Sequence, residues 1–366
     1  MILFILSYGG LRPAVMVFSP MKQIFVLLLF LFSLSVTHAQ IAGLASYSVL
    51  DMPSTARVAG LGFDYLSLYD DDVALTLDNP SLISPRVGNQ LSVGFVNLFS
   101  GTNFGSLAFS HSFKHLGAFT FGLQYDSYGQ FQGYDEYEQP MGAFTAADYV
   151  MSIGWGRAVD DNVAIGATFK PILSHYESYT AFAFGIDLAA SYFSSDRSFA
   201  FTIMGRNIGA QVFTFDGLTE RLPFELSVAG SYKLKDAPFR LHFALNELQT
   251  WDLTYEDELN PTTTTDPFTG EVIAKSALAT FADKAFRHLG VGIELNIRKA
   301  FFATVGYNYR QMVEMRAAET FNLSGFSFGF GINLKGIKIC YSRNNYHLTQ
   351  APNFISVTTS LDRFFR

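Results

Sequence analysis

Three consecutive carboxylates, Asp70, Asp71 and Asp72, are the first residues whose type and spacing suggest chemistry. Carboxylate oxygens are the ligands that calcium prefers, but the alternating spacing of a calcium-binding loop is absent here. A cluster that is solvated or paired with arginine is therefore the favoured interpretation. Arg57 is the nearest candidate partner in the same segment, and Arg310 is a candidate from a later strand.

The other reactive residue types lack the neighbours that catalysis requires. Cys340 is the single cysteine, no local base accompanies it, and strand alternation places it with Lys338 and Ser342. The seven histidines have no metal-site spacing. Gly60-Leu61-Gly62 lacks the third glycine of a dinucleotide-binding turn and is expected to be a simple turn. We predict no catalytic residue, no metal and no cofactor, so the protein is expected not to be an enzyme.

The composition is typical of a barrel that faces lipid. Charged residues are 16% of the chain and aromatic residues are also 16%, whereas a soluble domain averages about 25% charged residues. The net charge of −7 provides no basic surface for phosphates, so nucleic acid is excluded as an expected partner.

The N-terminal region has the three parts of a secretory signal. Lys22 precedes the apolar run 24–34, and small residues end at Ala39. We predict that 1–39 is removed and that the true start is Met21. The alternative is an uncleaved anchor, but the apolar run is shorter than the ~20 residues of a spanning helix.

From Leu91 onward, apolar residues alternate with small or polar residues at period two, which is the strand signature of a surface between two environments. Val291, Ile293 and Leu295, for example, alternate with Gly292, Glu294 and Asn296. We expect about fourteen strands, at approximately 91–99, 103–112, 116–126, 147–158, 163–176, 179–192, 198–208, 222–234, 239–248, 287–297, 300–310, 320–334, 337–347 and 353–366.

The fold class predicted from this pattern is all-β, a transmembrane antiparallel β-barrel spanning 89–366 in the bacterial outer membrane. Only helices and closed barrels satisfy every backbone group in lipid. A soluble β-sandwich is the alternative, and it would normally require a large core behind the same apolar face.

Short polar turns alternate with longer connections, which outer-membrane barrels place outside the cell. The expected long loops include 127–146 and 250–286, the second with a short helix at 275–287. Their aromatic residues are candidate partner contacts, namely Tyr134, Tyr137, Trp251, Tyr255 and Phe268.

The least strand-like part of the predicted mature chain is 56–82, within an N-terminal segment at 40–88. It contains Arg57, the turn glycines Gly60 and Gly62, the three aspartates, and Asn79-Pro80, where proline ends the preceding run.

Together these residues resemble the N-terminal signature of the PorV and PorQ family, barrels of the long-chain fatty acid transporter type found in Bacteroidetes. Ser81 departs from the alanine that usually follows Asn-Pro in the transporters. The resemblance implies that 40–88 is a plug or hatch inside the barrel. It also implies a role in the type IX secretion system, in an attachment complex that processes cargo and attaches it to lipopolysaccharide.

In such a complex the expected partners are outer-membrane lipid and a surface protein similar to PorZ, with the sortase PorU and the shuttle PorV nearby. Our first hypothesis is therefore a barrel that anchors a partner at the cell surface. The alternative is a transporter of fatty acids or other hydrophobic molecules. An enzyme acting on lipid is the weakest, because neither a nucleophile nor a base can be placed.

Overall fold

The computed structural model describes residues 47–98, 101–217, 219–254, 264–265, 272–273, 276–298, 300–315, 323–345 and 351–364. The predicted signal region at 1–39 lies outside these residues, as do Tyr255 and Phe268.

Fourteen antiparallel strands form a closed barrel, in which each strand pairs with its neighbour in the chain and the last strand returns to the first. The strands are β1 Gln90–Asn97, β2 Asn103–Phe113, β3 Gly117–Tyr134, β4 Pro140–Ala158, β5 Val163–Tyr176, β6 Tyr179–Phe193, β7 Phe199–Phe213, β8 Glu225–Lys233, β9 Phe239–Leu245, β12 Leu289–Ile297, β13 Phe301–Asn308, β14 Phe326–Leu334, β15 Ile337–Asn344 and β16 Asn353–Ser360. The two-residue strands β10 Thr264–Thr265 and β11 Val272–Ile273 pair only with each other. The predicted barrel of about fourteen strands is confirmed.

The strands present two different faces, as the period-two pattern predicts. On β12 the side chains of Val291 and Ile293 are exposed on the outer surface, whereas Gly292 and Glu294 are buried toward the lumen. The outer surface of the other strands is likewise rich in exposed Phe, Leu, Ile and Tyr side chains. An apolar outer band on a closed antiparallel barrel is the form in which outer-membrane proteins cross lipid, and the protein is accordingly an outer-membrane barrel.

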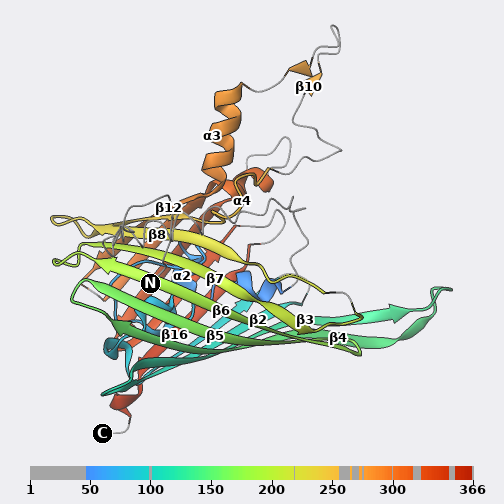
Figure 1. Ribbon diagram of the computed structural model, residues 1–366, viewed down its shortest axis with the longest axis horizontal. Helices are drawn as coiled ribbons and strands as arrows, with labels where there is room; N and C mark the ends of the chain where they lie inside the picture. Colours follow the sequence, from blue (N-terminus) through green and yellow to red (C-terminus); the bar gives the residue numbers. More distant parts are fainter. Residues whose placement is uncertain are drawn as a thin grey trace, which may run out of the picture. The chain divides into compact units, whose positions relative to one another are not determined.

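The connection between β3 and β4 differs from the sequence prediction. The predicted loop at 127–146 is mostly strand, because β3 continues to Tyr134 and β4 begins at Pro140. The pairing Gln130↔Thr145 to Tyr134↔Pro140 extends beyond the ends of β2 and β5, and Figure 1 shows this hairpin reaching well past its neighbours. Because both of its faces are solvated, no alternating pattern marked it as strand.

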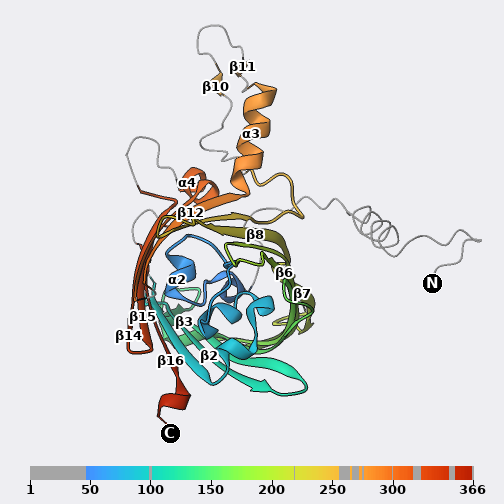
Figure 2. The same ribbon diagram turned by 90° about the vertical axis from the view of Figure 1, so that its left-hand side faces the viewer.

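Residues 47–88 contain no strand, and Figure 2 shows them inside the ring of strands. We call this segment the hatch. It consists of short helical turns, namely η1 Ser48–Asp51, α2 Ala56–Ala59, η2 Val73–Thr76, η3 Pro80–Leu82 and η4 Pro85–Val87. Its apolar side chains, including Val58, Leu61, Phe63 and Leu75, are almost fully buried against the inner wall. The hatch therefore supplies the core that a barrel of this size would otherwise lack.

Three further helices lie at the ends of strands: α3 Ala277–Arg287, α4 Tyr309–Glu314 and η5 Leu361–Arg363. The short helix predicted at 275–287 corresponds to α3, which begins where the Ser276 hydroxyl accepts a hydrogen bond from the Ala279 amide. Among the described residues, no helix combines the length and apolarity needed to cross a bilayer.

Candidate functional site

The contact between the hatch and the inner wall is the candidate functional site, and it begins with α2. The Thr55 hydroxyl caps this helix by accepting a hydrogen bond from the Val58 amide at 3.3 Å. Gly60 ends the helix, and Gly62 has a φ of +67°, a conformation that side chains rarely adopt. The cap and the glycine turn therefore fix the direction in which Arg57 leaves the helix.

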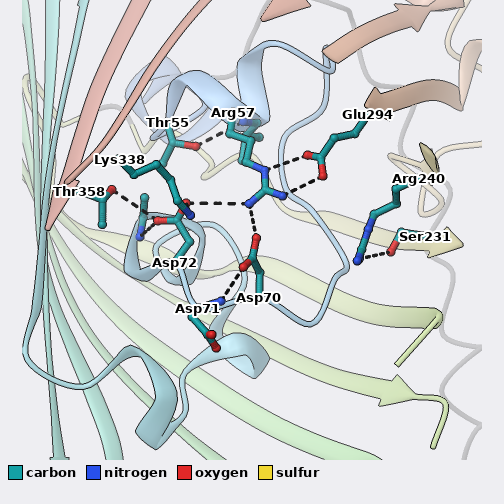
Figure 3. A network of polar contacts seen from close by, with 12 residues as sticks. Thr55, Arg57, Asp70, Asp71, Asp72, Ser231, Arg240, Glu294, Lys338 and Thr358 are labelled. Carbon is teal, nitrogen blue, oxygen red and sulfur yellow. Dashed lines mark hydrogen bonds and ion pairs between the residues drawn. The ribbon is translucent and has the colours of Figure 1, made fainter. Parts of the chain in front are cut away.

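Arg57 is the centre of a buried ion cluster (Figure 3). Its guanidinium donates two hydrogen bonds to Glu294 of β12, at 2.9 and 3.0 Å, and a further one to Asp70. The guanidinium also lies 5.0 Å from the centre of the Phe302 ring. Arg57 is 3% exposed and Glu294 is fully buried, so the wall and the hatch share a pair of charges shielded from water.

Asp72 continues the cluster along the wall to β15 and β16, which β13 and β14 separate from β12. It accepts hydrogen bonds from Lys338 of β15 at 2.9 Å and from Thr358 of β16 at 3.4 Å. Its other role is local, because it caps η2 by accepting from the Ala74 amide. Asp72 thus connects the hatch to the two strands that close the barrel beside β1.

Asp71 differs from its two neighbours. Its side chain is 54% exposed and pairs with Arg86 of the hatch at 3.1 Å. An exposed pair of this kind contributes little to stability. The three consecutive aspartates therefore differ: Asp72 is buried, Asp70 is 30% exposed but paired with the buried Arg57, and Asp71 is solvated.

The electrostatics of the hatch follow from this pairing. Burial alone would lower the pKa of Arg57, but Glu294 and Asp70 outweigh it and hold the pKa well above its usual value. Burial would raise the pKa of Asp70, but Arg57 outweighs it and holds that pKa well below the usual range. Both groups remain charged at any physiological pH.

The far side of the hatch, around Asn79-Pro80, contacts the wall through hydroxyl groups. The Asn79 amide donates to the Leu66 carbonyl at 3.0 Å, and its oxygen accepts from the Ser81 amide and hydroxyl. Ser81 also contacts the Ser191 hydroxyl of β6 at 2.6 Å, and Ser191 contacts Thr202 of β7. Asn79-Pro80 is therefore the start of η3 rather than a simple stop.

Close backbone contacts complete this side. A side chain added at Gly166 of β5 would place its Cβ 2.1 Å from the Pro80 carbonyl oxygen, and one at Gly156 of β4 would meet the Ile83 oxygen at 2.3 Å. These wall positions accept only glycine while the hatch is seated.

A nearby hatch carboxyl, that of Asp78, forms no ion pair with any residue that the structure describes. Asp78 accepts hydrogen bonds from the Ser54 hydroxyl at 2.6 Å and the Ser54 amide at 3.4 Å. Burial raises the pKa of Asp78 to about 6, because these hydrogen bonds only partly offset the loss of water. Asp78 therefore takes up a proton in mild acid, whereas Arg57 and Asp70 keep their charges.

The structure places the sequence-predicted residues as follows. Arg57, Asp70 and Asp72 come together, Asp71 lies beside them, and Gly60, Gly62 and Asn79-Pro80 form the turns of the hatch. The expected pairing of the aspartates with Arg310 is wrong, because Arg310 pairs with Glu247 and Glu314. Cys340 is buried on the lumen side, where strand alternation places it.

The candidate contact residues are more dispersed. Tyr134 is the last residue of β3 rather than part of a loop, which corrects the prediction, and Tyr137 lies in the hairpin turn. Trp251 lies after β9, with its ring against those of Phe281 and His288.

The sequence did not reveal Glu294 and Lys338, the wall partners of the hatch. Both are charged residues at positions where strand alternation predicts a side chain facing the lumen. This pattern could have identified them as candidate partners of the hatch. In the part of the chain that the structure describes, no three His, Cys, Asp or Glu residues are grouped so as to hold a metal.

No family model matches this sequence, and no curated protein matches it. Solved structures do resemble its fold. The TodX monoaromatic hydrocarbon channel deltaS2 mutant is 11% identical, with a TM-score of 0.50 over 85% of this chain and 98% of that one. The toluene transporter TodX of Pseudomonas putida is 10% identical, with a TM-score of 0.49 over 86% and 99%.

A Pseudomonas aeruginosa FadL homologue is 11% identical, with a TM-score of 0.43 over 84% of this chain and 98% of the homologue. At these identities the likeness shows the barrel fold alone.

Proposed function

We propose that the protein is a plugged outer-membrane barrel that holds a partner protein at the cell surface and does not act as an enzyme. The observation that carries the proposal is the β3–β4 hairpin, which extends past the neighbouring strands and pairs only with itself.

The hairpin has the properties of a preformed docking surface. Phe131, Tyr134, Tyr137 and Met141 are 44%, 62%, 81% and 74% exposed. The turn is held by Asp135, whose carboxylate accepts hydrogen bonds from the Tyr137 and Gln139 amides at 2.8 Å. Exposed aromatic residues on a rigid element are typical hot spots of protein interfaces.

The seated hatch supports the same proposal. Ion pairs on one side and backbone contacts on the other hold the hatch against the inner wall, which favours a function carried by the surface of the barrel rather than by an open lumen. The hatch signature and the segment Ile41–Asp51 also resemble PorQ. The partner would then be a surface protein similar to PorZ within a type IX secretion attachment complex, with proteins similar to PorU and PorV nearby.

Co-purification in detergent tests the proposal. The variant Tyr134→Ser/Tyr137→Ser/Met141→Ser is expected to recover at least about 30-fold less of the PorZ-like protein, since a hot-spot residue contributes about 2 kcal/mol or more. The matched control is Leu116→Ser, an apolar residue that is 64% exposed in the turn at the other end of β3. Full recovery with the hairpin variant would exclude the hairpin as the docking surface.

Transport of a hydrophobic molecule is the second candidate, favoured by the fold shared with the TodX channel. It requires a path past the hatch, because the hatch lies inside the barrel. Uptake of a labelled fatty acid by cells that produce the protein decides between the candidates. Uptake that is lost in an Asn79→Ala/Pro80→Ala variant would favour transport. Absence of uptake by cells with the unaltered protein counts against transport.

A further inference from the structure

Helix α3 is amphipathic, and its apolar side is exposed. Leu278, Phe281 and Phe286 lie on one side of the helix and are 78%, 58% and 51% exposed. The opposite side carries Asp283, Lys284 and Arg287. A helix of this pattern normally buries its apolar side, and among the described residues none covers the exposed parts of Leu278, Phe281 and Phe286.

The polar side of α3 is attached to the rim of the barrel. Asp283 accepts hydrogen bonds from the Tyr309 hydroxyl at 2.8 Å and from Arg287 at 3.2 Å. Lys284 pairs with Asp252 at 2.6 Å. These contacts join the polar side of the helix to the rim and leave most of its apolar side exposed.

The direction of α3 indicates what covers it. Figures 1 and 2 show the helix extending sideways from the outside of the wall at the start of β12, rather than over the mouth of the barrel. The wall directly below is lipid-facing, since Val291 and Ile293 are the next outward residues of β12.

The apolar surface is continuous from the helix to the wall. The Phe286 ring lies 5.8 Å from the ring of Tyr309, and the Trp251 ring lies 5.5 Å from that of Phe281. Below them, a groove of about 540 Å³ on the outer wall is lined by Leu241, Phe243, Val291, Ile293, Val305 and Tyr307, among others. This groove has the lining that an acyl chain requires.

We propose that α3 is an interfacial anchor that lies on the outer leaflet, with its apolar side in the lipid and a lipid acyl chain in the groove below. Leu and Phe on one side, basic residues on the other and a tryptophan at the edge are the features of helices that lie in a membrane interface. The α3 region then contacts lipid, and the β3–β4 hairpin is left for the partner protein. Trp251, proposed from the sequence as a partner contact, is reassigned to lipid.

Fluorescence quenching of the purified protein in vesicles tests this proposal without any partner protein, so its failure is distinct from that of the docking proposal. The chain has two tryptophans, and Trp155→Phe leaves Trp251 as the single reporter. In phosphatidylcholine vesicles brominated at the 6 and 7 acyl positions, emission from Trp251 is expected to fall at least about twofold relative to unbrominated vesicles, as for a tryptophan in the interface.

The control variants lie on the two sides of the helix. Leu278→Ser/Phe281→Ser is expected to abolish quenching by brominated lipid, whereas Thr280→Ser on the polar side leaves it unchanged. If Trp155→Phe fails to insert, the difference between the unaltered protein and Trp251→Phe gives the same measurement.

Two results would overturn the proposal. In the first, brominated lipid leaves the emission of Trp251 unchanged, whereas the water-soluble quencher acrylamide reduces it fully. In the second, Trp251 is shielded from acrylamide only after the PorZ-like protein is added, which would make α3 a contact for a protein.

Discussion

The two sides of the hatch are attached to the same barrel wall by different physical means. The α2 side uses charges: Arg57 pairs with Glu294, and Asp72 pairs with Lys338, with all four groups at most 17% exposed. The η3 side uses hydroxyl hydrogen bonds and backbone contacts against wall glycines. The first attachment depends on the charge of a few side chains, whereas the second depends on shape.

The difference predicts which side can be released. A buried ion pair stabilises the hatch only while both partners are present, because removing one leaves a charge without water. A close backbone contact has no single group to remove and can be broken only by adding atoms to the wall. The charged side is therefore expected to respond most to the removal of one charge, and the packed side to the enlargement of one wall glycine.

The largest effect is expected from Arg57→Met. This variant leaves Glu294 and Asp70 without their ion-pair partner, while Asp72 keeps Lys338, and it destabilises the seated hatch by about 3–5 kcal/mol. Faster amide exchange in α2 and higher conductance in planar bilayers are the expected results. Asp71→Asn is the matched control, because its exposed pair with Arg86 contributes at most about 1 kcal/mol.

Removal of the opposite charge sharpens this prediction. The double variant Arg57→Met/Glu294→Gln is expected to recover part of the lost stability, since the buried carboxylate that Arg57 neutralised is then absent. Equal effects of Arg57→Met and Asp71→Asn would show that the buried cluster does not hold the hatch.

The second-largest effect is expected from Gly166→Ala on the packed side. Its new Cβ would lie 2.1 Å from the Pro80 carbonyl oxygen, so η3 must shift, at a cost of about 1–3 kcal/mol. Hydrogen exchange of the Leu82 and Ile83 amides measures the shift, because these amides donate to Asn79 and Pro80. Gly185→Ala makes the same chemical change where the nearest atom, Leu222 Cδ2, would lie 3.4 Å from the new Cβ, and little change is expected there. An exchange rate that Gly166→Ala leaves unaltered would mean that η3 is not held by this contact.

The same contrast explains how much could be predicted from the sequence. The fourteen strands were visible because lipid on one side and the hatch on the other impose a period of two on β12 and its neighbours. The β3–β4 extension was missed because water surrounds both of its faces beyond Ser127. Arg57 and Asp70 were singled out as a charged pair within one segment.

Their wall partners could not be paired from the sequence. Glu294 is 237 positions from Arg57, and closure of the barrel rather than any local pattern brings them together. The glycines below Pro80 and Ile83 resemble any other strand glycines until the path of the hatch is known. Local spacing therefore identified the charged side, and only the fold revealed the packed side.

The smallest effect is expected from Ser81→Ala, which tests whether the two sides act independently. The substitution removes the hydroxyl contacts to Asn79 and Ser191, but Ser191 keeps Thr202 and Asn79 keeps the Ser81 amide. The loss is about 1 kcal/mol, because no buried group is left wholly unpaired. The Leu82 and Ile83 amides are then expected to exchange about fivefold faster, while the Gly60 amide, which donates to Ala56 in α2, keeps its rate. Equal acceleration at Gly60 would mean that the hatch opens as one rigid body, so that its charged and packed sides could not be released separately.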